Sequence, residues 1–267
     1  MTGYARYMAA GIVVLAAALV FVLATAPQGP GPDRDLLFQV STIDALLIGD
    51  YEGSVSFSDL RACGDFGLGT FDALDGEMVA FEGSFWQVRA DGSVTAVPGT
   101  MTTPFSVVTW FDTDLTFSLD GPVNLTGIET AVDAHRVSQN YFSAVWVDGI
   151  FDTVTVRSVP RQEKPYPPLA DAVLNQSVYT YTSVEGALVG FWSPAYVSGI
   201  NVPGYHLHFI SDDRTMGGHV LGCSLRSGDV ALDTTPRFTM VLPDTASFSS
   251  ADLTGDRTLE LKTVEKK

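Results

Sequence analysis

Basic side chains are scarce in this sequence. The 267 residues include 15 lysines and arginines against 31 aspartates and glutamates, which gives a formal net charge of -16. A surface with this excess of negative charge repels the phosphate backbone of DNA and RNA, so the sequence predicts no nucleic-acid partner. It also implies that any anionic substrate must meet a local positive centre in the protein.

Cysteine is nearly absent as well. Cys63 and Cys223 are the only two, too few for the disulfide framework that stabilises small secreted domains. Hydrophobic residues make up 46% of the chain and aromatic residues 11%, which is enough for a packed core without covalent cross-links. We therefore expect a globular protein in which Cys63 and Cys223 are not bridged.

Charge is missing altogether from the stretch Met8 to Ala26. As a helix it would cross the hydrocarbon core of a bilayer, and the linker "PQGPGPD" follows it. We expect residues 1–35 to form an uncleaved membrane anchor with its linker. A cleaved signal peptide is the alternative, because "ATA" fits a small-x-small cleavage site. The remainder is then either a membrane-anchored extracytoplasmic domain or a secreted or periplasmic protein.

The remaining chain has the pattern of an α/β protein of the strand-rich α+β kind. Short apolar segments alternate with turns, and the turns are marked by Asp75-Gly76, Glu82-Gly83 and Asp91-Gly92. Dipeptides of this type favour the tight turns of β-hairpins. The spacing predicts strands at "GTFDAL", "EMVAF", "SFWQVRA" and "SVTAV", and further strands at "FSVVTWF" and "FSAVWVDGIFDTVTVRSV".

Few helices interrupt these strands. The segment "STIDALLIG" predicts a short helix capped by Ser41, and "TGIETAVDAH" predicts another that starts with Thr126 and Glu129 in capping-box spacing. The segment "QEKPYPPLADAV" contains three prolines and predicts a crossing between two sheet-based subdomains. We place their boundary at Lys164, which gives subdomains 36–164 and 165–267.

Three of the four histidines occur in "GYHLHFISDDRTMGGHVLGC". If "GYHLHFIS" is a strand, His206 and His208 project from the same face. The pair Gly217-Gly218 permits a reversal that brings His219 back alongside them. Three imidazoles leave one position of a tetrahedral metal open, as in catalytic zinc sites. The stretch therefore predicts a metal centre at His206, His208 and His219.

Other interpretations of the histidines stay open. Each imidazole can instead satisfy ordinary hydrogen bonds of a folded core. The cupins carry a comparable His-x-His hairpin, although the following carboxylate and glycine of that family are matched only loosely by Asp212 and Gly217. Cys223 lies four residues beyond His219, roughly 13 Å along a strand, which is too far for a fourth ligand.

Several stretches together resemble the α-acetolactate decarboxylases and occur in the order of that family: "GDFGLGTFDALDGEM", "GSFWQVRADG", "TPF", "VDGIFDTVTVRSV", "QEKPYPPL" and "GYHLHFISDDRTMGGHV". The resemblance runs from about Leu36 to the carboxyl end. It implies two sheet-based subdomains, often a homodimer, and a zinc ion held by three histidines. It also implies a carboxy-lyase that converts 2-acetolactate to (R)-acetoin and carbon dioxide.

The resemblance also assigns roles to residues of this chain. The implied zinc ligands are His206, His208 and His219, the implied catalytic residues are Glu77, Arg157 and Glu265, and the implied substrate-binding residues are Arg157 and Thr70. Glu260 is a second candidate for the role of Glu265. The chain departs from some members at Ser84, where they have a further glutamate seven residues after the first.

The implied reaction needs these residue types. Loss of carbon dioxide from a β-keto acid leaves an electron pair that is delocalised as an enediolate, which a zinc ion with neutral ligands can stabilise. Arg157 can bind the substrate carboxylate, and Glu77, or else Glu265, can supply the proton. No organic cofactor is required.

Two other functions use the same histidines. One is a cupin-like metal enzyme, such as an iron dioxygenase or an isomerase. The other is a non-enzymatic extracytoplasmic module that binds a metal. The family resemblance favours the decarboxylase over both.

Overall fold

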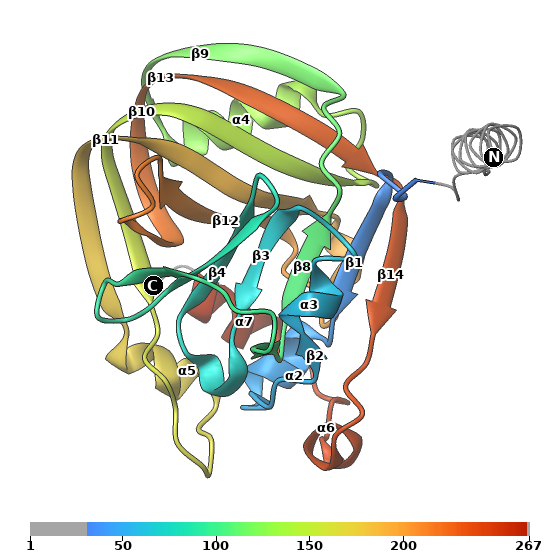
Figure 1. Cartoon of the computed structure of the whole chain (residues 1–267). Helices are drawn as coiled ribbons and strands as arrows, with labels where there is room; N and C mark the ends of the chain where they lie inside the picture. Colours follow the sequence, from blue (N-terminus) through green and yellow to red (C-terminus); the bar gives the residue numbers. More distant parts are fainter. Residues whose placement is uncertain (1–30, 266–267) are drawn as a thin grey trace, which may run out of the picture. The chain divides into compact units, whose positions relative to one another are not determined.

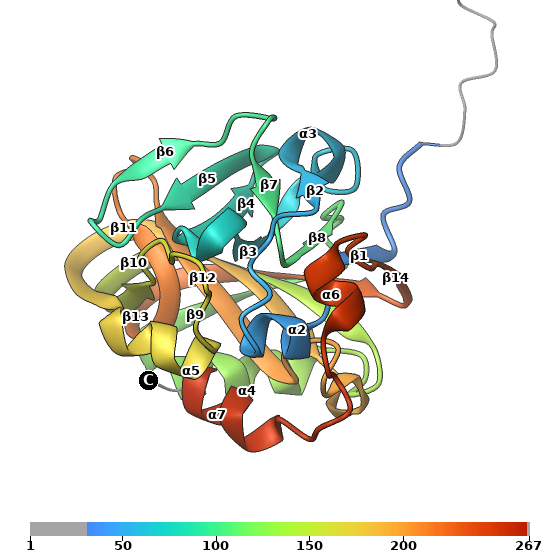
Figure 2. The same ribbon diagram turned by 90° about the horizontal axis from the view of Figure 1, so that it is seen from below.

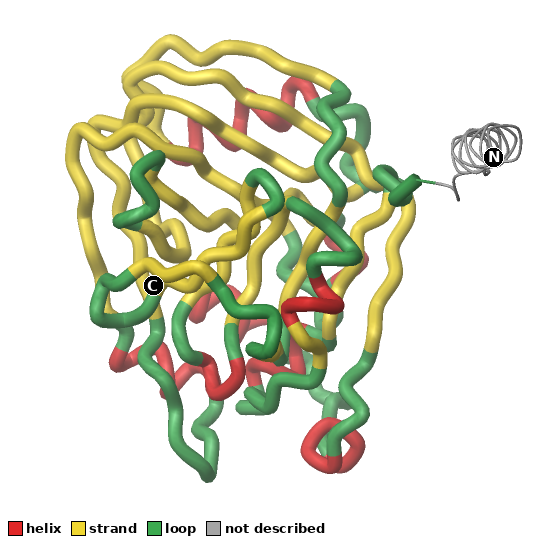
Figure 3. Tube along the Cα trace, viewed as in Figure 1, coloured by secondary structure: helices red, strands yellow, loops and turns green. Residues whose placement is uncertain are grey.

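The computed structural model of this chain describes residues 31–265. The uncharged stretch Met8 to Ala26, with its predicted anchor or signal peptide, lies outside the described residues. Within them, no helix combines the length and the apolar character needed to cross a membrane. Strands account for most of the regular structure (Figure 3), so the predicted strand-rich α+β class is confirmed.

One sheet contains seven strands in the order β14-β1-β8-β3-β4-β5-β6. The strands are β1 (Leu36–Val40), β3 (Phe66–Thr70), β4 (Glu77–Phe81), β5 (Ser84–Val88), β6 (Val94–Ala96), β8 (Ser106–Thr109) and β14 (Arg237–Val241). Neighbours are antiparallel except β1 and β14, which run parallel. A separate small pair joins β2 (Val55–Ser56) to β7 (Thr102–Thr103).

The other sheet curls until it closes on itself. Its strands are β9 (Leu115–Asn124), β10 (Phe142–Ser158), β11 (Ser177–Ser193), β12 (Gly204–Ser211) and β13 (Gly217–Thr235). β10 pairs with β11, β11 with β12, β12 with β13, and β13 again with β10, while β9 extends the sheet along β13. The long strands are visibly bent in Figure 1.

A row of glycines permits this bend. Gly149 lies opposite both Gly186 and Gly228 on the neighbouring strands. A Cβ atom at Gly228 would lie 2.4 Å from the carbonyl oxygen of Asp148, and one at Gly149 would lie 2.4 Å from that of Ser227. Side chains at these positions would therefore keep the backbones from approaching each other as closely as the barrel requires.

The helices are short and lie mainly at one end of the fold. They are α2 (Ile43–Leu47), α3 (Phe57–Leu60), α4 (Leu125–His135), α5 (Leu169–Ala172), α6 (Ala246–Ser250) and α7 (Thr258–Glu265), with 3-10 turns η1 (Asp72–Leu74), η2 (Val173–Asn175) and η3 (Ala195–Val197). Figures 1 and 2 show α2, α5 and α7 near one another at that end. The longest, α4, buries Ile128 and Val132 against the curled sheet.

Both predicted helix starts are off by a residue or two. Asn124 caps α4 by accepting a hydrogen bond from the Gly127 amide at 2.8 Å, whereas Thr126 lies within the first turn. Thr42, not Ser41, caps α2. In each case the residue in extended conformation just before the first turn is the one whose side chain reaches the free amides.

The predicted turns form with different lengths. Glu82-Gly83 makes the tightest hairpin, since Phe81 and Ser84 pair directly across it. Asp91-Gly92 lies between β5 and β6 as expected. Asp75-Gly76 does not form a two-residue turn, because the end of the predicted strand "GTFDAL" turns into η1 before β4 begins.

The two sheets do not divide at Lys164, where the sequence predicted a boundary. β9 and β10 precede that point, but they belong to the curled sheet with β11 to β13, and β14 returns to the seven-stranded sheet. The described residues from Arg34 onward form one compact unit. The proline-rich segment only connects β10 to its neighbour β11, because proline restricts the local backbone and does not decide which sheet the next strand joins.

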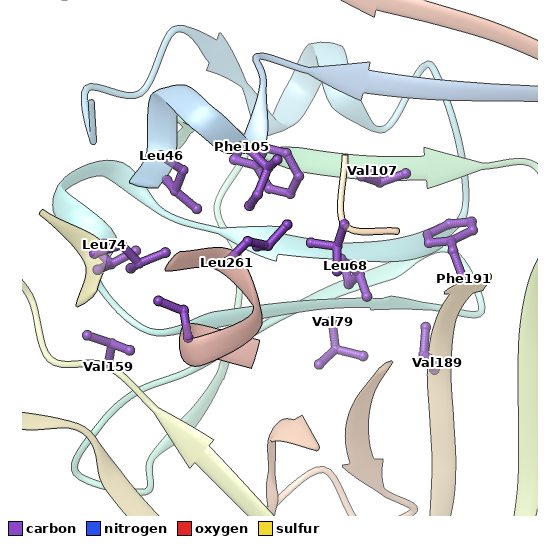
Figure 4. Close-up of a cluster of buried hydrophobic side chains, with 14 of the residues drawn as sticks. Leu46, Leu68, Leu74, Val79, Phe105, Val107, Val159, Val189, Phe191 and Leu261 are labelled. Carbon is purple, nitrogen blue, oxygen red and sulfur yellow. The ribbon is translucent and has the colours of Figure 1, made fainter. Parts of the chain in front are cut away.

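Side-chain alternation forms three packed layers. Val79 and Phe81 of β4 face the interior between the two sheets, in the cluster shown in part in Figure 4. Met78 and Ala80 face the other side, toward α3. On β12, Leu207 and Phe209 point into the curled sheet. Glu77 is on the same face of β4 as Val79 and Phe81, and His206 and His208 alternate with Leu207 and Phe209 on β12, so these three side chains face the region between the sheets.

Replacing Gly228 by alanine is expected to lower the free energy of unfolding by about 1–3 kcal/mol, because the added methyl group overpacks the strand contact. Urea unfolding followed by circular dichroism measures the change. Gly222 on the same strand is the control, since no described atom lies within 4 Å of a Cβ there. Gly222→Ala should change stability by less than about 0.5 kcal/mol. Equal losses in both variants would contradict this account of the bend.

Candidate metal centre

The three histidines predicted to bind metal do meet. His206 and His208 alternate along β12, and His208 lies directly opposite His219 on β13. One ring nitrogen from each residue lies within 4.8 Å of the other two. The ring centroids are 5.0 to 5.4 Å apart. The hairpin thus gathers three potential ligand atoms at one point between the sheets.

Hydrogen bonding determines which nitrogen of His208 is available. Its Nδ1 lies 2.8 Å from the backbone carbonyl oxygen of Met78. A carbonyl only accepts, so Nδ1 carries the proton and Nε2 keeps the lone pair. Among the described residues, buried Nε2 of His208 and Nδ1 of His206 have no hydrogen-bond partner. Unpartnered nitrogens of this kind fit a bound metal ion, because metal coordination would satisfy a lone pair.

The surroundings keep the imidazoles neutral. Burial, followed by the positive charge of Arg157, lowers the pKa of His206 to about 3. Burial is also the main reason that the pKa values of His208 and His219 fall well below the ordinary value. Neutral imidazole is the form that binds transition metals. The donor set therefore suits zinc, and His206, His208 and His219 would hold it.

Arg157 stands beside the histidines because β10 and β13 pair with Arg157 opposite His219. Its side chain is only 5% exposed. Nη1 donates to the carbonyl oxygen of Val264 at 2.9 Å and to Oε1 of Gln176 at 3.2 Å. Nη2 lies 4.0 Å from Oε1 of Glu265, and buried Nε has no partner within residues 31–265. The Nε and Nη2 edge is thus the part of the guanidinium left for a ligand.

Glu77 begins β4 and faces the histidines. Its Oε2 lies 3.7 Å from Nε2 of His208. Burial raises the pKa of Glu77 to about 7, and the charge of Glu265 adds to this effect; the charge of Arg157 and a hydrogen bond from the Val159 amide act in the opposite direction. A carboxyl group with this pKa can hold or release a proton in neutral solution.

Glu265 reaches the same place from the last residue of α7. Its Oε2 lies 4.0 Å from Nε2 of His206 and 3.8 Å from Nε2 of His219. Burial raises the pKa of Glu265, and the charge of Arg157 partly offsets the rise. Glu260, the other candidate, is instead 3.6 Å from Arg257 and does not line the cavity. Of the two, the geometry favours Glu265.

These groups surround one small cavity. It has a volume of about 40 Å³, and its wall includes the three histidines together with Thr70, Glu77, Arg157 and Glu265. Thr70 pairs with Glu77 across β3 and β4, and its hydroxyl donates to the Gly76 carbonyl oxygen at 2.7 Å. All seven site residues named from the sequence are therefore brought together.

Sequence reasoning missed the groups that orient this site. They are the carbonyl oxygens of Met78 and Val264 and the side chain of Gln176. Every residue has a backbone carbonyl, so the sequence cannot show which ones orient a site. Gln176 does not belong to a recognisable motif. Both cysteines are free, as expected. Cys223 is not part of the histidine cluster.

Comparison with known proteins gives a consistent match. The sequence profile described as "Alpha-acetolactate decarboxylase" matches residues 37–255. The chain is 53% identical over 232 residues to the alpha-acetolactate decarboxylase of Methanosarcina mazei, which covers 87% of this chain and 81% of that protein. It is 46% identical to the alpha-acetolactate decarboxylase of Methylococcus capsulatus, over 84% of this chain and 86% of that one.

The fold agrees with a solved structure. The crystal structure of alpha-acetolactate decarboxylase from Bacillus subtilis strain 168 has a TM-score of 0.85 and 39% identity, over 87% of this chain and 100% of that chain. The profile match contains the histidines, Glu77 and Arg157 and ends at residue 255, before α7. The assignment of Glu265 therefore depends on the geometry described above.

Removing one histidine should abolish stable zinc binding. We expect His219→Ala to lower zinc affinity by more than about tenfold. Even the loss of a residue that only hydrogen-bonds to a metal ligand lowers metal affinity about 10–100-fold. Elemental analysis after dialysis against a weak chelator measures it. His135→Ala is the control. This fourth histidine stacks on Phe117 with 3.9 Å between the ring centroids, and it lies outside the cluster of three histidines. Equal zinc retention in the two variants would refute the site.

Proposed function

The chain belongs to the alpha-acetolactate decarboxylase family, and we propose that it converts 2-acetolactate to (R)-acetoin and carbon dioxide with a zinc ion bound by His206, His208 and His219. The observation that carries this proposal is a single buried cavity in which neutral imidazoles, an arginine and two carboxyl groups face each other. A β-keto acid needs one group for each of these tasks: stabilising charge, binding the carboxylate and delivering a proton.

Zinc, when bound, would supply a Lewis acid for the negative charge that develops on the substrate oxygens. Arg157 binds the carboxylate through Nε and Nη2, because Nη1 is already held by Val264 and Gln176. A guanidinium edge offers two parallel donors, which fixes the orientation of a carboxylate as well as its position. Burial excludes water that would compete for these donors.

Glu77 is the proton donor in this proposal. The C–C bond to the carboxylate breaks, carbon dioxide leaves, and the electron pair left on carbon takes a proton from Glu77. A donor fixed on one side of the cavity protonates one face of the intermediate, which accounts for a single enantiomer of acetoin. Glu265 is the alternative donor, and Thr70 lines the cavity as a substrate contact.

The same histidines would also serve a cupin-like dioxygenase or isomerase, or a module that only binds metal. Family membership and the raised pKa of Glu77 beside the cluster favour the decarboxylase. We further propose that the reaction takes place outside the cytoplasm, on the basis of the uncharged stretch Met8 to Ala26. A homodimer is the assembly implied by the family resemblance.

Chelation tests the proposed reaction. Purified chain should form acetoin from racemic 2-acetolactate, lose this activity after treatment with a chelator and dialysis, and regain it when zinc is added. Chiral gas chromatography measures the amount and the enantiomer. Folded, zinc-loaded protein that forms no acetoin would refute the decarboxylase, and activity restored only by iron with oxygen consumption would support the dioxygenase.

Replacing the proton donor should slow the reaction without removing zinc. We expect Glu77→Gln to lower kcat by about 10²–10⁴-fold, the usual contribution of a positioned acid or base. Glu260→Gln, at a carboxyl group outside the cavity, should leave kcat unchanged. Similar kcat in the wild type and Glu77→Gln would assign the proton to another group.

The pH profile gives a second test of the same residue. An acid must be protonated to act, so wild-type kcat should fall as pH rises through the pKa of Glu77. Burial raises the pKa of Glu77 to about 7, and a dication bound by the histidines would lower it by stabilising the carboxylate. Glu77→Gln should lack this alkaline fall. An identical fall in the variant would contradict the role of Glu77.

A further inference from the structure

The cavity at the metal centre is too small for the proposed substrate. Its volume of about 40 Å³ is far below the roughly 300–1,000 Å³ of sites that bind small molecules. A five-carbon hydroxy keto acid needs several times the space of this cavity. Part of the wall must therefore move before a substrate can bind.

A much larger groove lies on the other side of that wall. Its volume is about 700 Å³, and it runs between α4, η3, β12, β13 and α7. His219 and Glu265 line both the groove and the cavity. Since His219 sits on a paired strand, the carboxyl end of α7 with Glu265 is the part of the partition that belongs to no sheet.

α7 is also weakly anchored. Only Leu261 and Val264 of its eight residues are buried. Leu261 inserts among the side chains shown in Figure 4, while Leu259 is 79% exposed. The polar contacts of α7 include the 2.9 Å hydrogen bond from Arg157 to the Val264 carbonyl oxygen, the 3.8 to 4.0 Å approaches of Glu265 to the site, and a 3.3 Å contact between Thr258 and Ser198. Elements with few buried contacts open locally at the lowest free-energy cost.

The groove also contains a positive charge. Lys262 of α7 is the only lysine or arginine among the described residues that line it, and Glu129 and Glu265 line it as well. In a chain with a net charge of -16, a cation at this place would favour the approach of a small carboxylate anion. It lies on the same helix that separates the groove from the metal centre.

We propose that this groove is the entry site for the carboxylate substrate, that Lys262 attracts the anion, and that α7 swings aside to admit it. This inference rests on the proposed function for the identity of the anion. Opening α7 removes Glu265 and the Val264 carbonyl from Arg157, and closure after binding returns them. After closure, Arg157 donates to the Val264 carbonyl oxygen through Nη1 and to the substrate carboxylate through Nε and Nη2.

Obstruction of the groove gives the first test. Thr126 lies on the exposed side of α4 and lines the groove, whereas Thr130 is exposed one turn later and does not. Thr126→Trp should lower kcat/KM for 2-acetolactate severalfold with zinc content unchanged, and Thr130→Trp should not. Equal kcat/KM in the two variants would overturn this entry route.

Salt dependence tests Lys262. Lys262→Met should lower kcat/KM severalfold at low ionic strength, and the difference from wild type should vanish at high salt because exposed charges are then screened. Lys164→Met is the matched control, since Lys164 pairs with Glu52 and does not line the groove. A Lys262→Met variant with the wild-type salt dependence would remove Lys262 from the proposal.

Hydrogen exchange tests the motion without turnover. The zinc-loaded full chain is compared with and without 2,3-dihydroxy-2-methylbutanoate, which has the carboxylate but lacks the ketone needed for decarboxylation. Amides of α7 should exchange faster than those of β12 and β13 in the free protein and slow when the analogue binds. Slower exchange confined to elements other than α7 would overturn the proposed motion of α7. This result stands whether or not acetoin is formed, so it separates the entry route from the proposed reaction.

Discussion

Removal of charged and polar groups from water is the constraint on which this site depends. An arginine, two glutamates and three histidines are placed between the two sheets. In such surroundings a charge is costly unless it is paired. The imidazoles respond by staying neutral, the pKa of Glu77 rises toward 7, and Arg157 keeps its charge by donating to Val264 and Gln176. Burial therefore prepares the imidazoles to bind a metal and Glu77 to donate a proton, while the paired Arg157 keeps the charge that can bind a carboxylate.

The sheets supply the precision that this arrangement needs. His208 and His219 are opposite each other in one pair of strands, and His219 and Arg157 in the next. Strand register thus places all three side chains in one row across the curled sheet. The seven-stranded sheet contributes Glu77 and the Met78 carbonyl from a single strand, because successive residues alternate between side-chain faces while their carbonyls remain in the sheet.

Local features of the fold could be predicted from the sequence, and long-range ones could not. The strand "GYHLHFIS" occurs as β12 with the expected bounds, because its alternation of polar and apolar residues is complete within eight positions. The two sheets do not separate at Lys164, since pairing partners far apart in sequence decide which strands share a sheet. Within the site, the residues with reactive side chains were all named. The carbonyl groups that orient them were not, because every residue has one.

The metal centre and the substrate contacts can be observed together in one measurement. A crystal of the zinc-loaded chain with 2,3-dihydroxy-2-methylbutanoate, with anomalous scattering recorded at the zinc edge, locates both the ion and the carboxylate. We expect zinc bound by His206, His208 and His219, and the carboxylate on the Nε and Nη2 edge of Arg157 with Glu77 facing the analogue. Zinc at another place, or a carboxylate turned away from Arg157, would contradict this arrangement.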